Sequence, residues 1–111
     1  MRIPKKLKIG GMVYTVEITD NLNSGSNNSS AEISYRDLII RVCPMARARM
    51  ESSFLHEVIH GMADAMGFVE HDEKLVDALS QMLYQVIQDN PEMFLPDEDE
   101  GAADEQRDDQ K

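Results

Sequence analysis

Two histidines and a glutamate stand close together near the middle of the chain, in the pentapeptide His56-Glu57-Val58-Ile59-His60. On an α-helix, His56 and His60 lie one turn apart on the same face, so both imidazoles can reach one ion. Imidazole nitrogens are common ligands of Zn²⁺, and Glu57 points beside such an ion, where a carboxylate can act as a general base. The spacing therefore indicates a site for one Zn²⁺. The same pentapeptide also occurs by chance on helix surfaces, so a third ligand is required.

The third ligand must come from another part of the chain. In the extended HExxHxxGxxH pattern it is a histidine six residues after the second one, but Met66 occupies that position here. Glu73 is the favoured candidate, and His71 and Asp72 stay open as alternatives. Asp77 follows Glu73 one turn later on the same flank of the next helix. We expect its carboxylate to accept the outer N–H of a ligating histidine.

Two pairs of short apolar runs precede the histidines. The first pair surrounds Gly10-Gly11 and the second surrounds Arg36-Asp37. Turn residues between alternating apolar residues are typical of β-hairpins. The sequence therefore predicts a small antiparallel sheet of about four strands within residues 5–42.

Two helices are predicted after the sheet, at residues 45–66 and 72–89. We expect Gly67 to end the first helix in a left-handed conformation and Asp72 to cap the second. The apolar spacing predicts core stripes of Leu55, Val58, Ile59, Met62 and Met66 on the first helix and Leu75, Leu79, Met82, Leu83 and Val86 on the second. A sheet followed by two packed helices gives the fold class α+β, with a single domain over residues 1–95.

The composition is that of a globular chain with an acidic end. The 111 residues are 41% hydrophobic and 29% charged, and the formal net charge is −10. Residues 96–111 hold eight acidic and two basic residues, which predicts a disordered tail. A single cysteine, Cys43, excludes an internal disulfide, and no apolar run is long enough to span a bilayer, so we expect a cytoplasmic monomer that does not bind membranes. The basic cluster at residues 5–8 is too small to indicate nucleic-acid binding.

The two motifs HEVIH and EKLVD resemble those of the gluzincin metallopeptidases. The chain is also similar in size and element order to the compact gluzincins and to the small zinc peptidase-like proteins of phages and prophages, the ImmA/IrrE-like group. The resemblance implies a minimal zincin-like domain in which His56, His60 and Glu73 bind one Zn²⁺. It also implies that Glu57 is the base and that Asp77 orients a ligating histidine.

These features predict a zinc-dependent metallopeptidase that acts on a peptide or protein substrate. The resemblance to phage proteins suggests a phage repressor as that substrate. Tyr84 and His71 are candidate donors to the oxyanion. Two other classes stay open: a zinc-binding, non-catalytic regulatory or interaction domain of phage origin, and a metal-free helical-hairpin adaptor. A further hypothesis is that the apolar residues 91–96 fold over the site and inhibit it.

Overall fold

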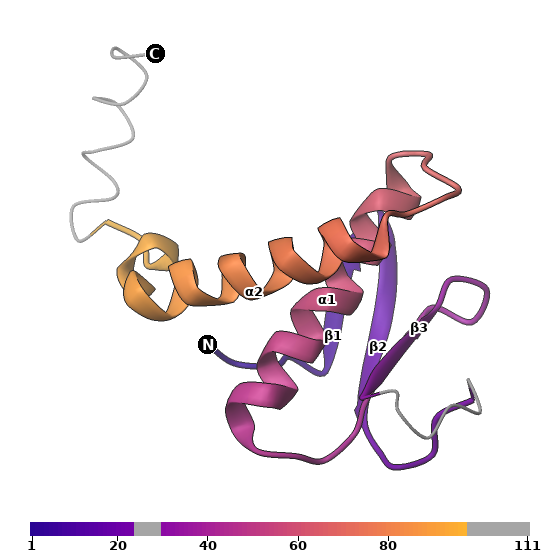
Figure 1. Ribbon diagram of the computed structural model, residues 1–111, viewed down its shortest axis with the longest axis horizontal. Helices are drawn as coiled ribbons and strands as arrows, with labels where there is room; N and C mark the ends of the chain where they lie inside the picture. The colour runs from indigo at the N-terminus through magenta and orange to yellow at the C-terminus, as the bar shows by residue number, and fades with distance from the viewer. Residues whose placement is uncertain (24–29, 98–111) are drawn as a thin grey trace.

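The computed structural model of the protein describes residues 1–23 and 30–97. Within these residues, four strands form one sheet and two helices follow, which confirms the α+β fold class (Figure 1). The elements are β1 (Lys6–Ile9), β2 (Met12–Ile18), β3 (Ala31–Ser34), β4 (Ile39–Val42), α1 (Arg47–Ala65), α2 (Glu73–Asp89) and the 3₁₀-helix η1 (Pro91–Phe94). The acidic tail predicted from residue 96 lies almost entirely outside the described residues.

The sheet is mixed, with strand order β1-β2-β4-β3. Both predicted hairpins are present as antiparallel pairs, β1 with β2 and β3 with β4. The expectation of a wholly antiparallel sheet is wrong at one pair, because β4 runs parallel to β2, with Thr15 opposite Ile39. The reason is that β4 inserts between β2 and β3. It is the most apolar strand, and Ile40 and Val42 are fully buried there.

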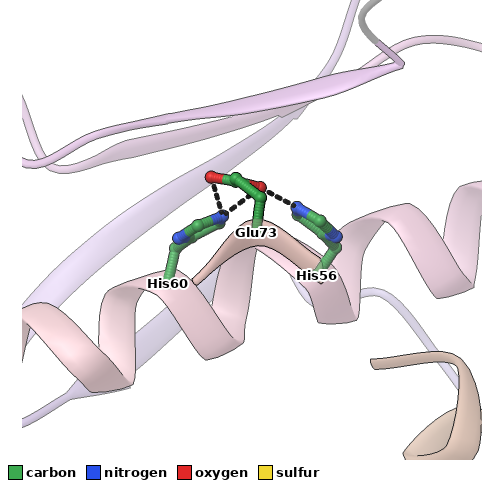
Figure 2. Close-up of side chains that lie close together, drawn as sticks. All are labelled: His56, His60 and Glu73. Atoms are coloured by element: carbon green, nitrogen blue, oxygen red, sulfur yellow. Dashed lines mark hydrogen bonds and ion pairs between the residues drawn. The ribbon is translucent and has the colours of Figure 1, made fainter. Parts of the chain in front are cut away.

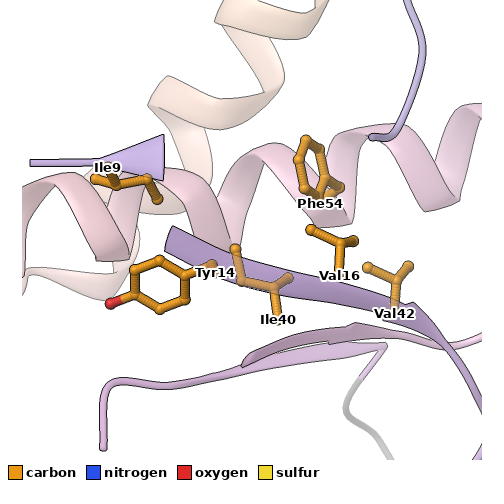
Figure 3. Packing of buried hydrophobic residues seen from close by; sticks show 6 residues of the cluster. All are labelled: Ile9, Tyr14, Val16, Ile40, Val42 and Phe54. Carbon is orange, nitrogen blue, oxygen red and sulfur yellow. The ribbon is translucent and has the colours of Figure 1, made fainter. Parts of the chain in front are cut away.

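The hydrophobic core lies between the sheet and α1 (Figure 3). Its buried members are Ile9, Tyr14, Val16, Ile40, Val42 and Phe54. Gly61 lets α1 approach the sheet closely, because a Cβ atom at this position would lie 2.9 Å from Cδ1 of Ile9 and 3.1 Å from Cδ1 of Ile33. A small residue thus brings the second half of α1, which carries the histidines, against the sheet.

The second helix packs on α1 and crosses it at a wide angle (Figures 1 and 3). Its buried residues are Val76 and Ser80. The predicted core stripe of α2 is therefore wrong in part, since Leu75, Leu79 and Met82 are 62%, 48% and 58% exposed. The face of α2 that meets α1 is rotated toward the flank that carries Glu73.

The predicted core stripe of α1 is confirmed in its first half. Leu55 and Ile59 are buried, and Val58 packs against the core. Met62 and Met66 are exposed, contrary to the prediction, because they lie on the last turns of the helix. Within the part of the chain that the structure describes, neither helix has the length and apolarity needed to cross a membrane.

Both predictions for the connection between α1 and α2, a left-handed Gly67 and a capping Asp72, are confirmed. Gly67 has a φ angle of 94°, and its N–H and that of Phe68 bond back to carbonyls of the last turn of α1, as in a Schellman motif. The carboxylate of Asp72 accepts the N–H groups of Lys74 and Leu75 at 3.0 and 3.2 Å, which caps α2. The connection is thus fixed at both ends.

Gly10 lies against Ala65 at the end of α1, so a substitution of Gly10 tests how α1 docks on the sheet. It has a φ angle of 58°, and a Cβ atom there would lie 2.7 Å from Cβ of Ala65. Gly10→Ala is therefore expected to lower the free energy of unfolding by about 2–4 kcal/mol, through left-handed strain and this overlap. Denaturant titration of Gly10→Ala, Ala65→Gly and the double variant measures the coupling. Recovery of about 1 kcal/mol or more in the double variant is expected, whereas additive losses would contradict the contact.

Candidate metal centre

The side chains of His56 and His60 rise from adjacent turns of α1 and meet the carboxylate of Glu73, the first residue of α2 (Figure 2). Oε1 of Glu73 lies 3.4 Å from Nε2 of His56 and 3.3 Å from Nε2 of His60. Oε2 of Glu73 lies 3.1 Å from Nε2 of His60. One ligand atom from each residue lies within 4.8 Å of the other two. The three side chains form a group that could hold one metal ion.

Two of the three separations between these atoms fit tetrahedral coordination. Ligands at ~2.0–2.1 Å from a tetrahedral ion lie about 3.3–3.4 Å from one another. The separations of 3.3 and 3.4 Å between Oε1 of Glu73 and the two imidazoles match that value. Two imidazoles and one carboxylate leave the fourth position open, as in catalytic zinc sites. The donor set and its spacing therefore suit an ion that also binds a water or a substrate.

Burial favours the neutral form of His60, the form that can bind a metal. Desolvation lowers the pKa of His60, and the negative charge of Glu73 opposes this effect in part. Only the neutral imidazole has a lone pair to give to a metal. His60 is therefore held in its ligating form at neutral pH.

Glu57 lies beside the ligands and is 8% exposed. Burial, followed by the negative charges of Glu73 and Glu32, raises the pKa of Glu57 to about 7. A carboxylate with this pKa can take up a proton and return it near neutral pH, which is what a general base requires. The role of Glu57 as a general base stays a prediction.

A cleft lies beside the three candidate ligands, His56, His60 and Glu73. It has two halves, with volumes of ≈ 560 Å³ and ≈ 510 Å³. Ala31, His56 and Glu57 line both halves of the cleft. Ala31 belongs to β3, the edge strand of the sheet, and Glu32 and Ile33 of the same strand line the second half. An edge strand thus borders the cleft beside the candidate metal centre.

The other residues considered as ligands or partners lie around the three. Oδ1 of Asp77 lies 3.6 Å from Nδ1 of His56, a distance too long for a hydrogen bond. Nδ1 is the nitrogen of His56 that faces away from Glu73, so Asp77 lies on the side where its predicted role would place it. Asp72 caps α2, and His71 contacts His60 instead of joining the group. Of the three candidates for the third ligand, Glu73 is the one that converges with the histidines.

Both candidate oxyanion donors use their polar atoms elsewhere. The hydroxyl of Tyr84 donates to the buried carboxylate of Glu51 at 2.7 Å, and Arg47 pairs with the same carboxylate at 2.9 Å. Nε2 of His71 lies 2.9 Å from the carbonyl oxygen of Phe68. An oxyanion role for Tyr84 or His71 stays a prediction, and it requires these bonds to break.

Tyr35 is a cleft residue that the sequence analysis did not single out. It follows β3 and lines the same half of the cleft as His60, His71 and Glu73. Burial, with the nearby charges of Asp64 and others, raises its pKa to about 12, so the hydroxyl stays protonated. This hydroxyl makes no hydrogen bond to any residue in 1–23 or 30–97. The only signal in the sequence is an aromatic residue at the end of an edge strand.

The segment expected to cover the site lies elsewhere. Residues 91–94 form η1, which contacts the end of α2, while Glu73 begins that helix. A helix of this length places its two ends roughly 24 Å apart. The self-inhibition hypothesis for residues 91–96 is therefore not supported by this arrangement, and Met93, Phe94 and Leu95 are exposed.

Comparison of the chain with protein-family models, with curated proteins and with solved structures found no match. The resemblance to gluzincins therefore rests on the two motifs and on the convergence of His56, His60 and Glu73.

The raised pKa of Glu57 predicts a pH-dependent effect of Glu57→Gln on the metal-free protein. The folded pKa is about 7 against the ordinary value of 4.5, so the unfolded chain ionises first. The folded protein therefore loses stability as the pH rises from 4.5 through 7. A difference of about 2.5 pKa units corresponds to a loss of roughly 3 kcal/mol in the free energy of unfolding. Because an amide does not ionise, Glu57→Gln is expected to raise Tm at pH 8.

Thermal unfolding in the presence of a chelator measures this effect at pH 4 and pH 8. The two proteins should have nearly the same Tm at pH 4, where the carboxyl of Glu57 is protonated in both the folded and the unfolded chain. An equal difference in Tm at the two pH values would contradict a raised pKa for Glu57.

Proposed function

We propose that the protein is a zinc-dependent peptidase that hydrolyses peptide bonds in the cleft between α1 and β3. The observation that carries this proposal is the position of Glu57, a buried residue with an acidic side chain that lines both halves of the cleft beside His56, His60 and Glu73. Burying a carboxylate disfavours its charged form and lowers stability near neutral pH. A metal site that served the fold alone would need no such group beside its ligands.

The residues around the cleft support the chemistry of peptide hydrolysis. A zinc ion held by His56, His60 and Glu73 would supply a Lewis acid and lower the pKa of water toward ~7. In this proposal Glu57 takes the proton from the attacking water and passes it to the leaving amine. The protonated hydroxyl of Tyr35 is available in the same half of the cleft to donate to the developing oxyanion.

The proposed substrate is an extended segment of a peptide or protein. Among residues 1–23 and 30–97, β3 pairs with β4 on one side only, so a substrate strand can add to its other edge by main-chain hydrogen bonds. Because the cleft continues on both sides of Glu57, residues before and after the scissile bond would both find room. A phage repressor or another phage-control protein is the substrate class that the resemblance to phage proteins favours.

Glu57→Gln separates a peptidase from a zinc-binding domain without catalysis. We expect the variant to bind Zn²⁺ as the wild type does and to lose about 10²–10⁴-fold in the rate of cleavage, because the base is removed and no ligand is touched. Cleavage is followed by mass spectrometry on a mixture of peptides of varied sequence. Asp64→Asn, which removes another carboxylate of the cleft, is the matched control and should keep most of the activity.

Two outcomes would change the assignment. Unaltered cleavage by Glu57→Gln would contradict the role of this residue as the base. A zinc-loaded wild-type protein that cleaves no peptide in the mixture would favour the non-catalytic zinc-binding domain.

Tyr35→Phe tests the oxyanion donor. The variant is expected to lower kcat by about 10²-fold with little change in KM, because the hydroxyl acts on the transition state and not on the bound peptide. Steady-state kinetics on one cleaved peptide measures both constants. A larger loss of kcat in Tyr84→Phe than in Tyr35→Phe would instead support the candidate that the sequence suggested.

A further inference from the structure

His71 links His60 to the backbone of the α1–α2 connection. Its Nδ1 lies 2.7 Å from Nδ1 of His60, and its Nε2 lies 2.9 Å from the carbonyl oxygen of Phe68. The first distance is shorter than the separation of two stacked rings, so the contact is an N–H···N hydrogen bond. The ring of Tyr35 packs edge-on against His71, with centroids 6.4 Å apart. The side chain of His71 is thus held from three sides.

The carbonyl of Phe68 determines where the protons lie in both rings. A carbonyl oxygen only accepts hydrogen bonds, so Nε2 of His71 carries the proton and Nδ1 of the neutral ring is an acceptor. Nδ1 of His60 must then donate, so in the neutral ring of His60 the lone pair that can bind a metal is on Nε2. This is the nitrogen that faces the carboxylate of Glu73 at 3.1 and 3.3 Å.

We propose that His71 is a positioning residue that holds His60 in the tautomer whose Nε2 lone pair points at the metal position. Two acceptors, this lone pair and the carboxylate of Glu73, then converge on one point, as the binding of a cation requires. The inference rests on the metal site of the proposed function and does not depend on peptide hydrolysis.

The two histidine ligands therefore have different outer partners. The outer nitrogen of His56 faces the carboxylate of Asp77 at 3.6 Å, whereas that of His60 donates to a neutral ring. His71 in turn is oriented by Phe68, the residue that follows the left-handed Gly67. The turn that ends α1 thus sets the orientation of a ligand eleven residues before His71.

Zinc affinity tests the proposal on the full-length, untagged chain. His71→Leu removes the acceptor for His60 and is expected to weaken Zn²⁺ binding about 10–100-fold, the usual effect of losing the partner of a metal-ligating histidine. His71→Gln offers one acceptor and one donor and should recover most of that loss. Glu70→Gln, in the same connection, is the matched control and should bind as the wild type does. Competition with a chromophoric chelator measures Kd for the four proteins.

The positions of the protons are measured directly by long-range ¹H–¹⁵N spectra of the metal-free protein with labelled histidine. In the wild type, Nδ1 of His60 should be protonated. In His71→Leu the Nε2–H form of His60 should gain population. This measurement needs neither zinc nor substrate, so it tests the role of His71 even if the proposed peptidase or its metal site fails.

Several results would overturn the proposal. One is wild-type affinity for Zn²⁺ in a folded His71→Leu variant. Another is an unprotonated Nδ1 of His60 in the wild type. A third is an equal loss of affinity in His71→Leu and His71→Gln together with an equal loss of Tm in the metal-free proteins, because that pattern belongs to a residue that only supports the fold.

Discussion

The candidate metal centre depends on one contact between the helices, in which the carboxylate of Glu73 meets the imidazoles of His56 and His60. This contact requires α2 to begin directly beside the second half of α1. The short connection achieves this with fixed geometry at both ends, a left-handed Gly67 after α1 and a capping Asp72 before α2. Because His71 lies between these two residues, the same connection also orients one of the ligands.

Bringing Glu73 to the histidines constrains how α2 can pack. The face that meets α1 carries the small side chain of Ser80 and the flank of Glu73, so Leu75, Leu79 and Met82 stay exposed. These three exposed side chains contribute little apolar burial to the joint between the helices, which limits its contribution to stability. A metal ion that binds the folded chain across this joint would stabilise it by mass action. The proposed zinc would thus support the fold as well as the chemistry.

Local rules allowed much of the fold and of the candidate metal centre to be predicted. The four-residue spacing of His56 and His60 requires only a helix to bring the imidazoles together, and that helix is present. The carboxylate of Glu73 was predicted at the start of the next helix, and the predicted cap at Asp72 explains why that helix starts there. Each of these features depends on a few neighbouring residues.

Features that depend on distant partners were not predictable in the same way. The parallel pairing of β2 with β4 depends on which strand fills the centre of the sheet. The alternation of apolar and polar residues within a strand does not show which strand pairs with it. The exposure of Leu75 follows from the rotation of α2 on α1. This rotation cannot be predicted from the spacing of the apolar residues in α2. Likewise, the contact of His71 with His60 and the place of Tyr35 in the cleft arise only when separate elements meet.

The central claim is that His56, His60 and Glu73 bind one zinc ion with a position left open. X-ray absorption at the zinc edge of the untagged, zinc-loaded protein tests it most directly, because it reports the ligand types around the ion. We expect one zinc per chain with nitrogen and oxygen ligands at ~2.0–2.2 Å, two of them imidazoles, and no sulfur. A chain that retains no zinc after dialysis, or a zinc bound by the sulfur of Cys43, would contradict it.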